Sequence, residues 1–433
     1  PVTSSAIARP DHPAVITDSA TCSWRELDQA SAREATVLGG LGLGAGDTIA
    51  LWSERSAPFV ATLHAIGRVG AAAAPLDKRR TGLIASMEAA RATTLLCTDA
   101  GQSVPSGIDS IRMIDHPDLP AAADRFQPLN EVRLVVLTSG TTGTPRAIRL
   151  TTLQIMTSAF GSAIRLGHDP ADRWLCCLPL HHVGGLSILL RSAFYGITTI
   201  LGEAGDERAT LMSLVPTQLQ RLLDARGVVP FGPHLRAILL GGGPTSPALL
   251  ARCEALSIPV SVTWGMTEAA SQITTRAPGD TRPDAGAGTP LPFVRVQSVD
   301  GVLVARGPIV RGVLATRDRG RVDAEGRVHV GGRSDDAIIS GGENIDPAAV
   351  EAVLDAHPDI AESAVVAIAH PEWGQRPAAV IVAAGDRQPT DEQLAAYCRE
   401  RLSRYEVPDE FRWIDGLPRN ALGKVVKHGL ETC

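Results

Sequence analysis

The chain has 433 residues, of which 44% are hydrophobic and 20% charged, and its formal net charge is −6. A chain of this length is too long for one ordinary hydrophobic core, which predicts two or three domains. The sequence has no long run of Lys or Arg, which argues against nucleic acid as a main partner. No apolar stretch reaches membrane-spanning length and the first residues lack a signal-peptide pattern, so we expect a cytoplasmic protein. The seven cysteines form no Cys-x-x-Cys pair, which favours buried thiols over disulfides or zinc ligands.

The first third of the chain alternates helical and strand patterns. Ser23 and Glu26 have the spacing of a capping box, which predicts a helix whose apolar face includes Leu27 and Leu38. Strands are expected at residues 48–52, 72–76, 94–97 and 133–137, with a helix over residues 57–69. This alternation favours a doubly wound α/β architecture.

A turn rich in hydroxyls and glycine follows the apolar run at residues 134–137. It extends from Thr138 to Arg146 and exposes backbone N–H groups and hydroxyl donors with little side-chain bulk, as a polyphosphate requires. Its glycines, Gly140 and Gly143, do not have the spacing of a Walker A loop. From composition alone, a flexible surface loop is an equally good interpretation.

Two further strands in the middle of the chain end in polar or glycine-rich turns. Residues 235–240 lead into the glycine-rich segment 241–244, and residues 259–263 lead into the segment 264–268, while Thr151 can cap a helix after the first turn. Because ligands collect at the carboxyl ends of strands in open α/β sheets, we expect these turns to share one crevice.

The sequence changes character from about residue 286. Short alternating strands at residues 295–298, 302–305 and 327–330 predict a small β-rich subdomain. Beyond the polar break at residues 331–336, the patterns predict a separate α+β domain of about 100 residues. Its elements are a helix over residues 347–356, strands at 363–368 and 378–382, and a helix over 391–402.

Five motifs in order resemble those of the adenylate-forming superfamily, which includes acyl-CoA synthetases, peptide-synthetase adenylation domains and luciferases. They are the hydroxyl-rich turn and the segments 264–268, 316–318, 332–345 and 417–424. The resemblance extends from about residue 20 to the C-terminus, and five motifs in order are far more specific than one. It implies an N-terminal domain over residues 1–334 that holds the nucleotide and the acid, and a mobile C-terminal domain over residues 335–433 with a hinge at Asp335.

The resemblance implies a catalytic role for Lys424, which would bridge the carboxylate of the acid and the α-phosphate of ATP. Joining two anions requires mostly positioning and charge neutralisation, which a lysine supplies. Glu268 and Thr142 would contact Mg²⁺, and His182 would gate or line the acyl pocket as part of the catalytic set. Taken singly, Lys424 also fits a surface lysine and Glu268 a carboxylate at a helix start.

The nucleotide itself would be held by residues of several motifs. Asp318 would accept hydrogen bonds from both ribose hydroxyls, with Arg333 donating to the same sugar. Trp264 would lie against adenine, where most members of the superfamily have Tyr, although a core Trp at a strand end is the plain alternative. Further contacts to ATP or coenzyme A are expected from Thr138, Ser139, Gly140, Thr141, Thr142, Gly143, Arg146, Gly241, Gly242, Gly265, Thr267, Gly341 and Gly342.

Two positions depart from the pattern of the superfamily. Arg146 replaces the usual Lys of the phosphate loop, which keeps the charge, and Arg317 replaces the usual Gly before Asp318. Neither departure removes a catalytic group.

The segment 178–187 resembles the acyl-pocket motif and offers no carboxylate for an amine, which argues against an amino acid substrate. The adjacent His181 and His182 point apart in an ordinary backbone, so a metal site between them is not favoured. Residues 182–191, 215–219, 240–244 and 271–274 resemble the o-succinylbenzoate–CoA ligases of menaquinone biosynthesis. The expected acyl-pocket residues are His182, Ser187, Arg191, Gly243, Ser271 and Gln272, each of which also fits an ordinary polar group of a helix or strand.

The resemblance therefore predicts an ATP-dependent, AMP-forming acid–CoA ligase that uses ATP, Mg²⁺ and coenzyme A, with o-succinylbenzoate as the favoured acid. Another aryl or acyl acid, or a carrier-protein thiol or amine as acceptor, is an open alternative. A catalytically silent nucleotide-binding protein is a third, which the presence of Lys424, Glu268 and Asp318 argues against. The oligomeric state, including a homo-oligomer, stays open.

Overall fold

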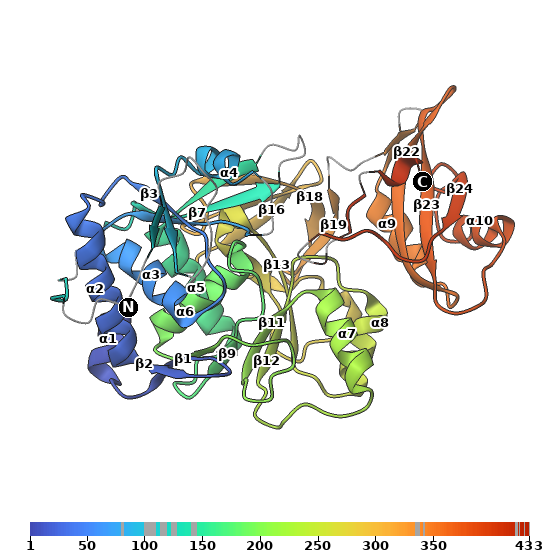
Figure 1. The fold of residues 1–433 in the computed structure, drawn as a ribbon. Helices are drawn as coiled ribbons and strands as arrows, with labels where there is room; N and C mark the ends of the chain where they lie inside the picture. Colours follow the sequence, from blue (N-terminus) through green and yellow to red (C-terminus); the bar gives the residue numbers. More distant parts are fainter. Residues whose placement is uncertain are drawn as a thin grey trace.

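The computed structural model describes most of the chain. It covers residues 1–78, 82–98, 110–112, 119–122, 128–139, 145–333, 338–340, 343–420, 423, 425–427 and 429–432. Figure 1 shows a large N-terminal body and a smaller C-terminal domain, drawn in orange and red, that stands at one end of it. The predicted fold class is confirmed.

A six-stranded sheet forms from the first third of the chain. Its order is β6 (Ser110–Arg112), β5 (Thr94–Cys97), β3 (Thr48–Leu51), β4 (Ala72–Pro75), β7 (Val132–Ser139) and β8 (Pro145–Thr151). Neighbouring strands are parallel except β7 and β8, which form an antiparallel hairpin. The hydroxyl-rich turn therefore connects two strands, and β8 is an element that the sequence analysis did not predict.

A nine-stranded sheet forms the second layer. Its order is β15 (Thr289–Pro290), β14 (Ser271–Thr275), β13 (Val260–Met266), β12 (Ala237–Leu240), β11 (Leu211–Leu214), β9 (Arg173–Leu175), β10 (Thr198–Ile200), β1 (Pro13–Ile16) and β2 (Thr21–Ser23). The strands from β13 to β1 are parallel, and antiparallel strands close both ends. β13 continues to Met266, so residues 264–266 belong to a strand and not to the turn that we expected.

The helices cover these sheets as a doubly wound fold requires. They are α1 (Val2–Ala8), α2 (Trp24–Gly40), α3 (Ala57–Arg68), α4 (Leu83–Ala90), α5 (Thr152–Leu166), α6 (Val183–Tyr195), α7 (Pro216–Arg226) and α8 (Pro247–Ala255). The predicted capping box of Ser23 and Glu26 opens α2, and a second one, Thr151 with Gln154, opens α5.

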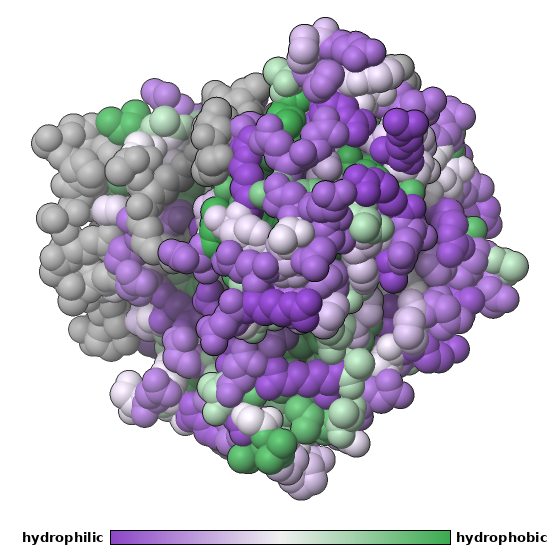
Figure 2. Space-filling view, turned by 90° about the vertical axis from the view of Figure 1, so that its right-hand side faces the viewer, coloured by the Kyte–Doolittle hydropathy of each residue, from purple (hydrophilic) through white to green (hydrophobic). Residues whose placement is uncertain are grey.

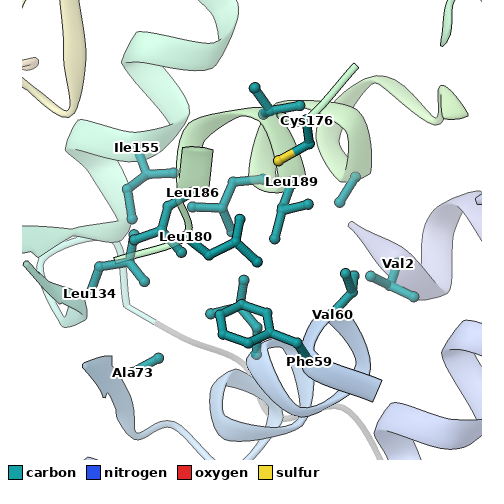
Figure 3. Close-up of a cluster of buried hydrophobic side chains, with 14 of the residues drawn as sticks. Val2, Phe59, Val60, Ala73, Leu134, Ile155, Cys176, Leu180, Leu186 and Leu189 are labelled. Atoms are coloured by element: carbon teal, nitrogen blue, oxygen red, sulfur yellow. The ribbon is translucent and has the colours of Figure 1, made fainter. Parts of the chain in front are cut away.

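The main hydrophobic core lies between the two sheets. Phe59 and Val60 of α3 face Leu180 and Leu186 across it (Figure 3), and all four side chains are buried. A second core on the other face of the nine-stranded sheet is covered by α7 and α8 (Figure 1). Burial of apolar area on both faces of the parallel strands explains why these strands are almost continuously hydrophobic.

The predicted β-rich subdomain is a four-stranded antiparallel sheet. Its strands are β16 (Arg295–Val299), β17 (Val302–Arg306), β18 (Val313–Val322) and β19 (Val328–Arg333). β18, which carries the predicted ribose residue Asp318, was not predicted as a strand. Its burial pattern shows why, because most of its side chains are at least partly exposed and give it no apolar run.

The C-terminal domain is built on a five-stranded sheet. It comprises β20 (Ile338–Ser340), β21 (Glu343–Ile345), α9 (Pro347–Leu354), β22 (Ile360–His370), β23 (Gly374–Ala383), α10 (Asp391–Arg399) and β24 (Glu410–Trp413). Alternate residues of β22 face opposite sides: Val365 packs toward α9 and α10, and Ala364 packs toward Leu417 of the segment that precedes Lys424. From this end of the molecule, the surface is mostly hydrophilic, with a small hydrophobic group at the lower edge (Figure 2).

Within the described part of the chain, no helix combines the length and the apolar composition that crossing a membrane requires.

Two glycines near β14 allow the cost of a left-handed backbone to be compared with the cost of steric overlap. Gly279 and Gly288 both have φ +79°, but a Cβ at Gly279 would meet open space, whereas one at Gly288 would overlap the backbone of Thr275 and Arg276. We expect Gly279→Ala to cost about 1–2 kcal/mol for its left-handed conformation, and Gly288→Ala to cost a further ~1–3 kcal/mol for overpacking. Urea unfolding of both variants checks this, and equal midpoints would contradict the packing around Gly288.

Candidate active site

The turn between β13 and β14 is the centre of the candidate site. Gly265 pairs with Gln272, and Met266 pairs with Ser271. A Cβ at Gly265 would overlap the carbonyl oxygen of Ser271, so this close pairing requires glycine. Ala270 and Ser271 have φ values of 52° and 111°, and such left-handed residues are concentrated at functional sites.

Glu268 lies in the 3-10 helix η1 (Thr267–Ala269) at this turn. Its carboxylate is 3.8 Å from the guanidinium of Arg146 on β8, and its backbone carbonyl accepts a hydrogen bond of 3.0 Å from Gln154 on α5. Thr138 Oγ1 donates to the carbonyl of Arg146 at 3.3 Å across the hairpin. The structure therefore brings Glu268 to the base of the hydroxyl-rich turn.

A carboxylate in this place suits Mg²⁺. The ion takes one or two protein carboxylates and completes its shell with phosphate and water oxygens, and the Glu268 side chain is 30% exposed beside a cationic partner that a phosphate would also attract. Among the described residues, no cluster of three or more His, Cys, Asp or Glu side chains forms a metal site made by protein alone.

The predicted ribose residues lie on neighbouring strands. Asp318 on β18 pairs directly with Arg333 on β19, so the two positions face the same region of the sheet. Trp264 Nε1 donates to Asp318 Oδ2 at 2.6 Å. The Trp264 ring is 8% exposed and packs in the core of the β-rich subdomain, and its contact with adenine stays a prediction.

The glycines after β12 lie next to β13, as expected for turns that share one edge of a sheet. A Cβ at Gly241 would be 2.6 Å from Thr263 Cγ2, and Gly242 has φ +81°, whereas Gly243 has open space around it. Gly243 therefore offers room for a ligand at this edge.

Arg191 of α6, one of the predicted acyl-pocket residues, is 2% exposed. Its Nη2 donates to Ser158 Oγ at 3.1 Å, while Nε and Nη1 have no hydrogen-bond partner among the residues that the structure describes. Burial lowers the pKa of the Arg191 guanidinium to about 10, so the group is still charged at neutral pH. A buried cation with unsatisfied donors is costly unless an anion completes it.

A small cavity of about 10 Å³ adjoins Arg191 and Ser187. Leu134 and Ile155 form its apolar wall and are labelled in Figure 3. Ser158, besides accepting from Arg191, donates to the carbonyl of Ala270 at 2.9 Å, and this bond ties the acyl side to the central turn.

Two other predicted acyl-pocket residues, Ser187 and Gln272, form hydrogen bonds within the protein. Ser187 Oγ donates to Gly184 at 3.0 Å, and Gln272 Nε2 donates to Thr275 Oγ1 at 2.7 Å. The Gln272 Oε1 atom is buried without a partner among the described residues. His181 lies 3.5 Å from the carboxylate of Asp77, and its ring centroid is 4.2 Å from that of His182.

The segment that carries Lys424 approaches the N-terminal body. Arg419, Asn420 and Gly423 line a cavity of about 190 Å³ whose other lining residues are Leu178, Pro179, Thr217, Gln218 and Arg221. Gly423 has φ +74° and lies so close to Thr217 that a Cβ would overlap Thr217 Oγ1.

Both ends of this segment are anchored in the C-terminal domain. Arg419 donates to the carbonyl of Gly423 at 2.7 Å and binds Glu362 on β22. Lys427 Nζ is 2.6 Å from Glu351 Oε1 on α9. These contacts fix the residues on either side of Lys424 in the sequence.

Several predicted residues lie outside the described residues, and their roles stay predictions. They are Gly140, Thr141, Thr142, Gly143, Asp335, Gly341, Gly342 and Lys424, and the side chains of Ser139 and Arg333 are also not described.

Gln154, Ser158 and Asp77 were not predicted from the sequence, and Thr217 was included only as part of the segment 215–219. Gln154 carried a usable signal, because it is the third helical residue of a capping box after Thr151. Ser158 and Asp77 act through partners distant in sequence, so no local pattern marks them.

Known proteins resemble this chain over most of its length. The AMP-binding enzyme family matches residues 2–321, and the AMP-binding enzyme C-terminal domain matches residues 349–424. The chain belongs to the AMP-binding enzyme family. Within the family, it is 33% identical to a 2-succinylbenzoate–CoA ligase of Bacillus cereus over 467 aligned positions, which cover 98% of this chain and 96% of the ligase.

Solved structures of a family member, o-succinylbenzoate CoA synthetase of Bacillus subtilis, match the entire fold. The complex with the acyl-adenylate OSB-AMP has a TM-score of 0.88 at 31% identity, covering 100% of this chain and 98% of that one. The complex with ATP and magnesium has a TM-score of 0.86 at 32% identity, covering 99% and 98%. A double mutant bound to the product analogue OSB-NCoA covers 99% and 98% at 32% identity, but its TM-score is 0.71.

The close approach of Gly423 and Thr217 predicts an effect of Gly423→Ala. The added Cβ meets Thr217 Oγ1, and the left-handed backbone adds strain, so the segment should leave α7. We expect faster amide hydrogen exchange in the first turn of α7, partly restored by combining Gly423→Ala with Thr217→Ala. Gly429→Ala, which has φ +94° and open space, is the matched control, and no difference between it and Gly423→Ala would contradict the contact.

Proposed function

We propose that the chain is a 2-succinylbenzoate–CoA ligase. The acid and ATP would give the acyl-adenylate and pyrophosphate, and the thiol of coenzyme A would then displace AMP to give the thioester. The observation that carries the proposal is the match to ligases of this name and to their solved structures over nearly the whole chain. The cofactors follow from the same relatives, one of which was solved with ATP and magnesium.

In the adenylation step, the residues of the central turn would hold the nucleotide. Asp318 and Arg333 take the ribose, and Arg146 neutralises phosphate charge. Bound Mg²⁺ would withdraw charge from the leaving phosphates, with Glu268 as its protein ligand. Lys424 would neutralise the carboxylate and the α-phosphate as they approach, which is the electrostatic contribution that such a reaction needs.

For the second step, we propose that the C-terminal domain, residues 335–433, rotates at Asp335. The TM-scores support this: the chain matches the acyl-adenylate complex at 0.88 and the product-analogue complex at 0.71, although identity and coverage are nearly equal. A different arrangement of the two domains in the product-analogue complex would account for this difference. Gly341 and Gly342 would then approach the pantetheine arm. A cytoplasmic location and the oligomeric state stay predictions.

The buried Arg191 supports a substrate with a second carboxylate. Its Nε and Nη1 have no hydrogen-bond partner among the described residues, and each could donate a charge-assisted hydrogen bond to a carboxylate oxygen. An acid without this group would leave the cation unpaired in an apolar pocket.

A panel of carboxylic acids, with 2-succinylbenzoate included, tests the proposal through acid-dependent pyrophosphate release and thioester formation. Lys424→Ala should abolish pyrophosphate release, because no other group is proposed to neutralise the two anions. Arg387→Ala removes a cation whose side chain is 75% exposed and serves as the control. Activity with another acid but not with 2-succinylbenzoate would refute the specific assignment, and unimpaired release by Lys424→Ala would refute the mechanism.

Arg191→Met tests the acid-binding role. We expect the KM for 2-succinylbenzoate to rise about 10- to 100-fold, the effect of losing a charge-assisted hydrogen bond, while the KM for benzoate, which lacks the second carboxylate, stays within about twofold. The free energy of unfolding should not fall, because the substitution removes a buried charge. An equal rise in KM for both acids would contradict the assignment.

A further inference from the structure

The hydrogen bond between Trp264 and Asp318 gives Trp264 a second role besides packing. The indole of Trp264 is held in a buried position by the core of the β-rich subdomain, which includes Ile273, Leu291 and Leu303. From this fixed ring, Nε1 reaches Asp318 Oδ2 at 2.6 Å. A short bond from a rigid donor restricts the rotation of the carboxylate.

The backbone of Asp318 is fixed from the other side. Its N–H donates to Thr316 Oγ1 at 3.2 Å, and Thr316 Oγ1 donates to the carbonyl of Leu303 at 2.7 Å. Thr316 is buried. Asp318 is therefore held at its main chain by Thr316 and at its side chain by Trp264.

The chemistry of an indole suits this arrangement. Its N–H is a donor only, and an ionised carboxylate has about four acceptor sites, so one indole bond orients the group without exhausting its capacity to accept from two hydroxyls. A tyrosine at this position would carry its hydroxyl at the tip of the ring, whereas the indole N–H lies at the edge of the ring. The two donors would therefore not occupy the same place relative to Asp318.

We propose that Trp264 is a positioning residue that orients the Asp318 carboxylate toward the ribose of the nucleotide, and so contributes to selection of ATP over 2′-deoxy-ATP. This inference rests on the proposed function, because it takes Asp318 as the ribose acceptor. It assigns Trp264 a hydrogen-bonding role that is distinct from any contact of its ring with adenine.

Trp264→Phe tests the role, because it keeps an aromatic ring and removes the N–H. We expect the KM for ATP to rise about tenfold, as for the loss of one orienting hydrogen bond, with kcat and the KM for the acid nearly unchanged. The preference for ATP over 2′-deoxy-ATP, measured as the ratio of kcat/KM values, should fall by a similar factor. A purely structural defect would affect both nucleotides equally.

Trp24→Phe is the matched control. Trp24 is 2% exposed, and its indole nitrogen has no partner among the described residues, so this variant loses similar ring area without losing a hydrogen bond. Its preference between the two nucleotides should equal that of the wild type. In an Asp318→Ala background, Trp264→Phe should have no further effect on the preference.

Trp264→Tyr is the second variant, since the superfamily pattern has Tyr in this place and the fold should tolerate it. The preference should fall in this variant as well. An unchanged preference in both variants, with an active wild type, would overturn the positioning role and leave the proposed function standing. If the wild type were inactive with every acid, that inactivity would refute the proposed function. Calorimetric titration with ATP and with 2′-deoxy-ATP would then still measure the preference of each variant between the two nucleotides.

Discussion

The close antiparallel return of β14 along β13 is the constraint on which the rest of the site depends. It exists because Gly265 has no side chain and the carbonyl of Ser271 occupies the space where one would be. The return turns the chain through η1 and presents Glu268 on one side and Ala270 on the other. α5 holds both residues by their carbonyls, through Gln154 and Ser158. Because residues four apart share one face of a helix, a single helix fixes both halves of the turn.

This arrangement connects the places of two proposed binding functions through a few hydrogen bonds. Ser158 links Arg191 to the carbonyl of Ala270, two residues from Glu268. A ligand that pairs with Arg191 therefore acts on a residue bonded to the turn that would hold Mg²⁺. Two donors of the buried Arg191 cation have no hydrogen-bond partner among the described residues, although an apolar side chain would be more stable in such a place. The proposed binding of an anion would explain why this position has an arginine.

Local signals in the sequence were enough to predict much of the fold. The capping box of Ser23 located α2, and the sharp change of pattern near residue 286 located the β-rich subdomain. Apolar runs located the parallel strands β3, β4, β5, β7, β12 and β13, but the short parallel strands β1, β6, β9, β10 and β11 were not predicted. β8 was missed because Arg146 and Arg149, three positions apart, interrupt the period-2 alternation of apolar and polar residues that marks a strand. β18 was missed because it is exposed along most of its length.

The site was less predictable because its bonds are long-range. Motif order pointed to Glu268 and Asp318, and the resemblance of the segment 182–191 pointed to Arg191; the structure places partners around each of them. The bond from Trp264 to Asp318 spans 54 positions in the sequence, and it depends on a core and a sheet register that no local pattern records. Trp264 illustrates the difference, since the sequence offered adenine contact or core packing, and the structure adds a hydrogen bond that neither interpretation contained.

The cavity between the segment near Lys424 and α7 has a consequence for the proposed rotation of the C-terminal domain. Its volume of about 190 Å³ and its mostly polar lining, with Thr217, Gln218 and Asn420 among its residues, leave room for several water molecules at about 30 Å³ each. A water-filled interface has little apolar area to expose when it opens, and its hydrogen bonds can be exchanged for bonds to solvent. Such an interface would let the two domains part and meet again during the proposed rotation without exposing a packed core.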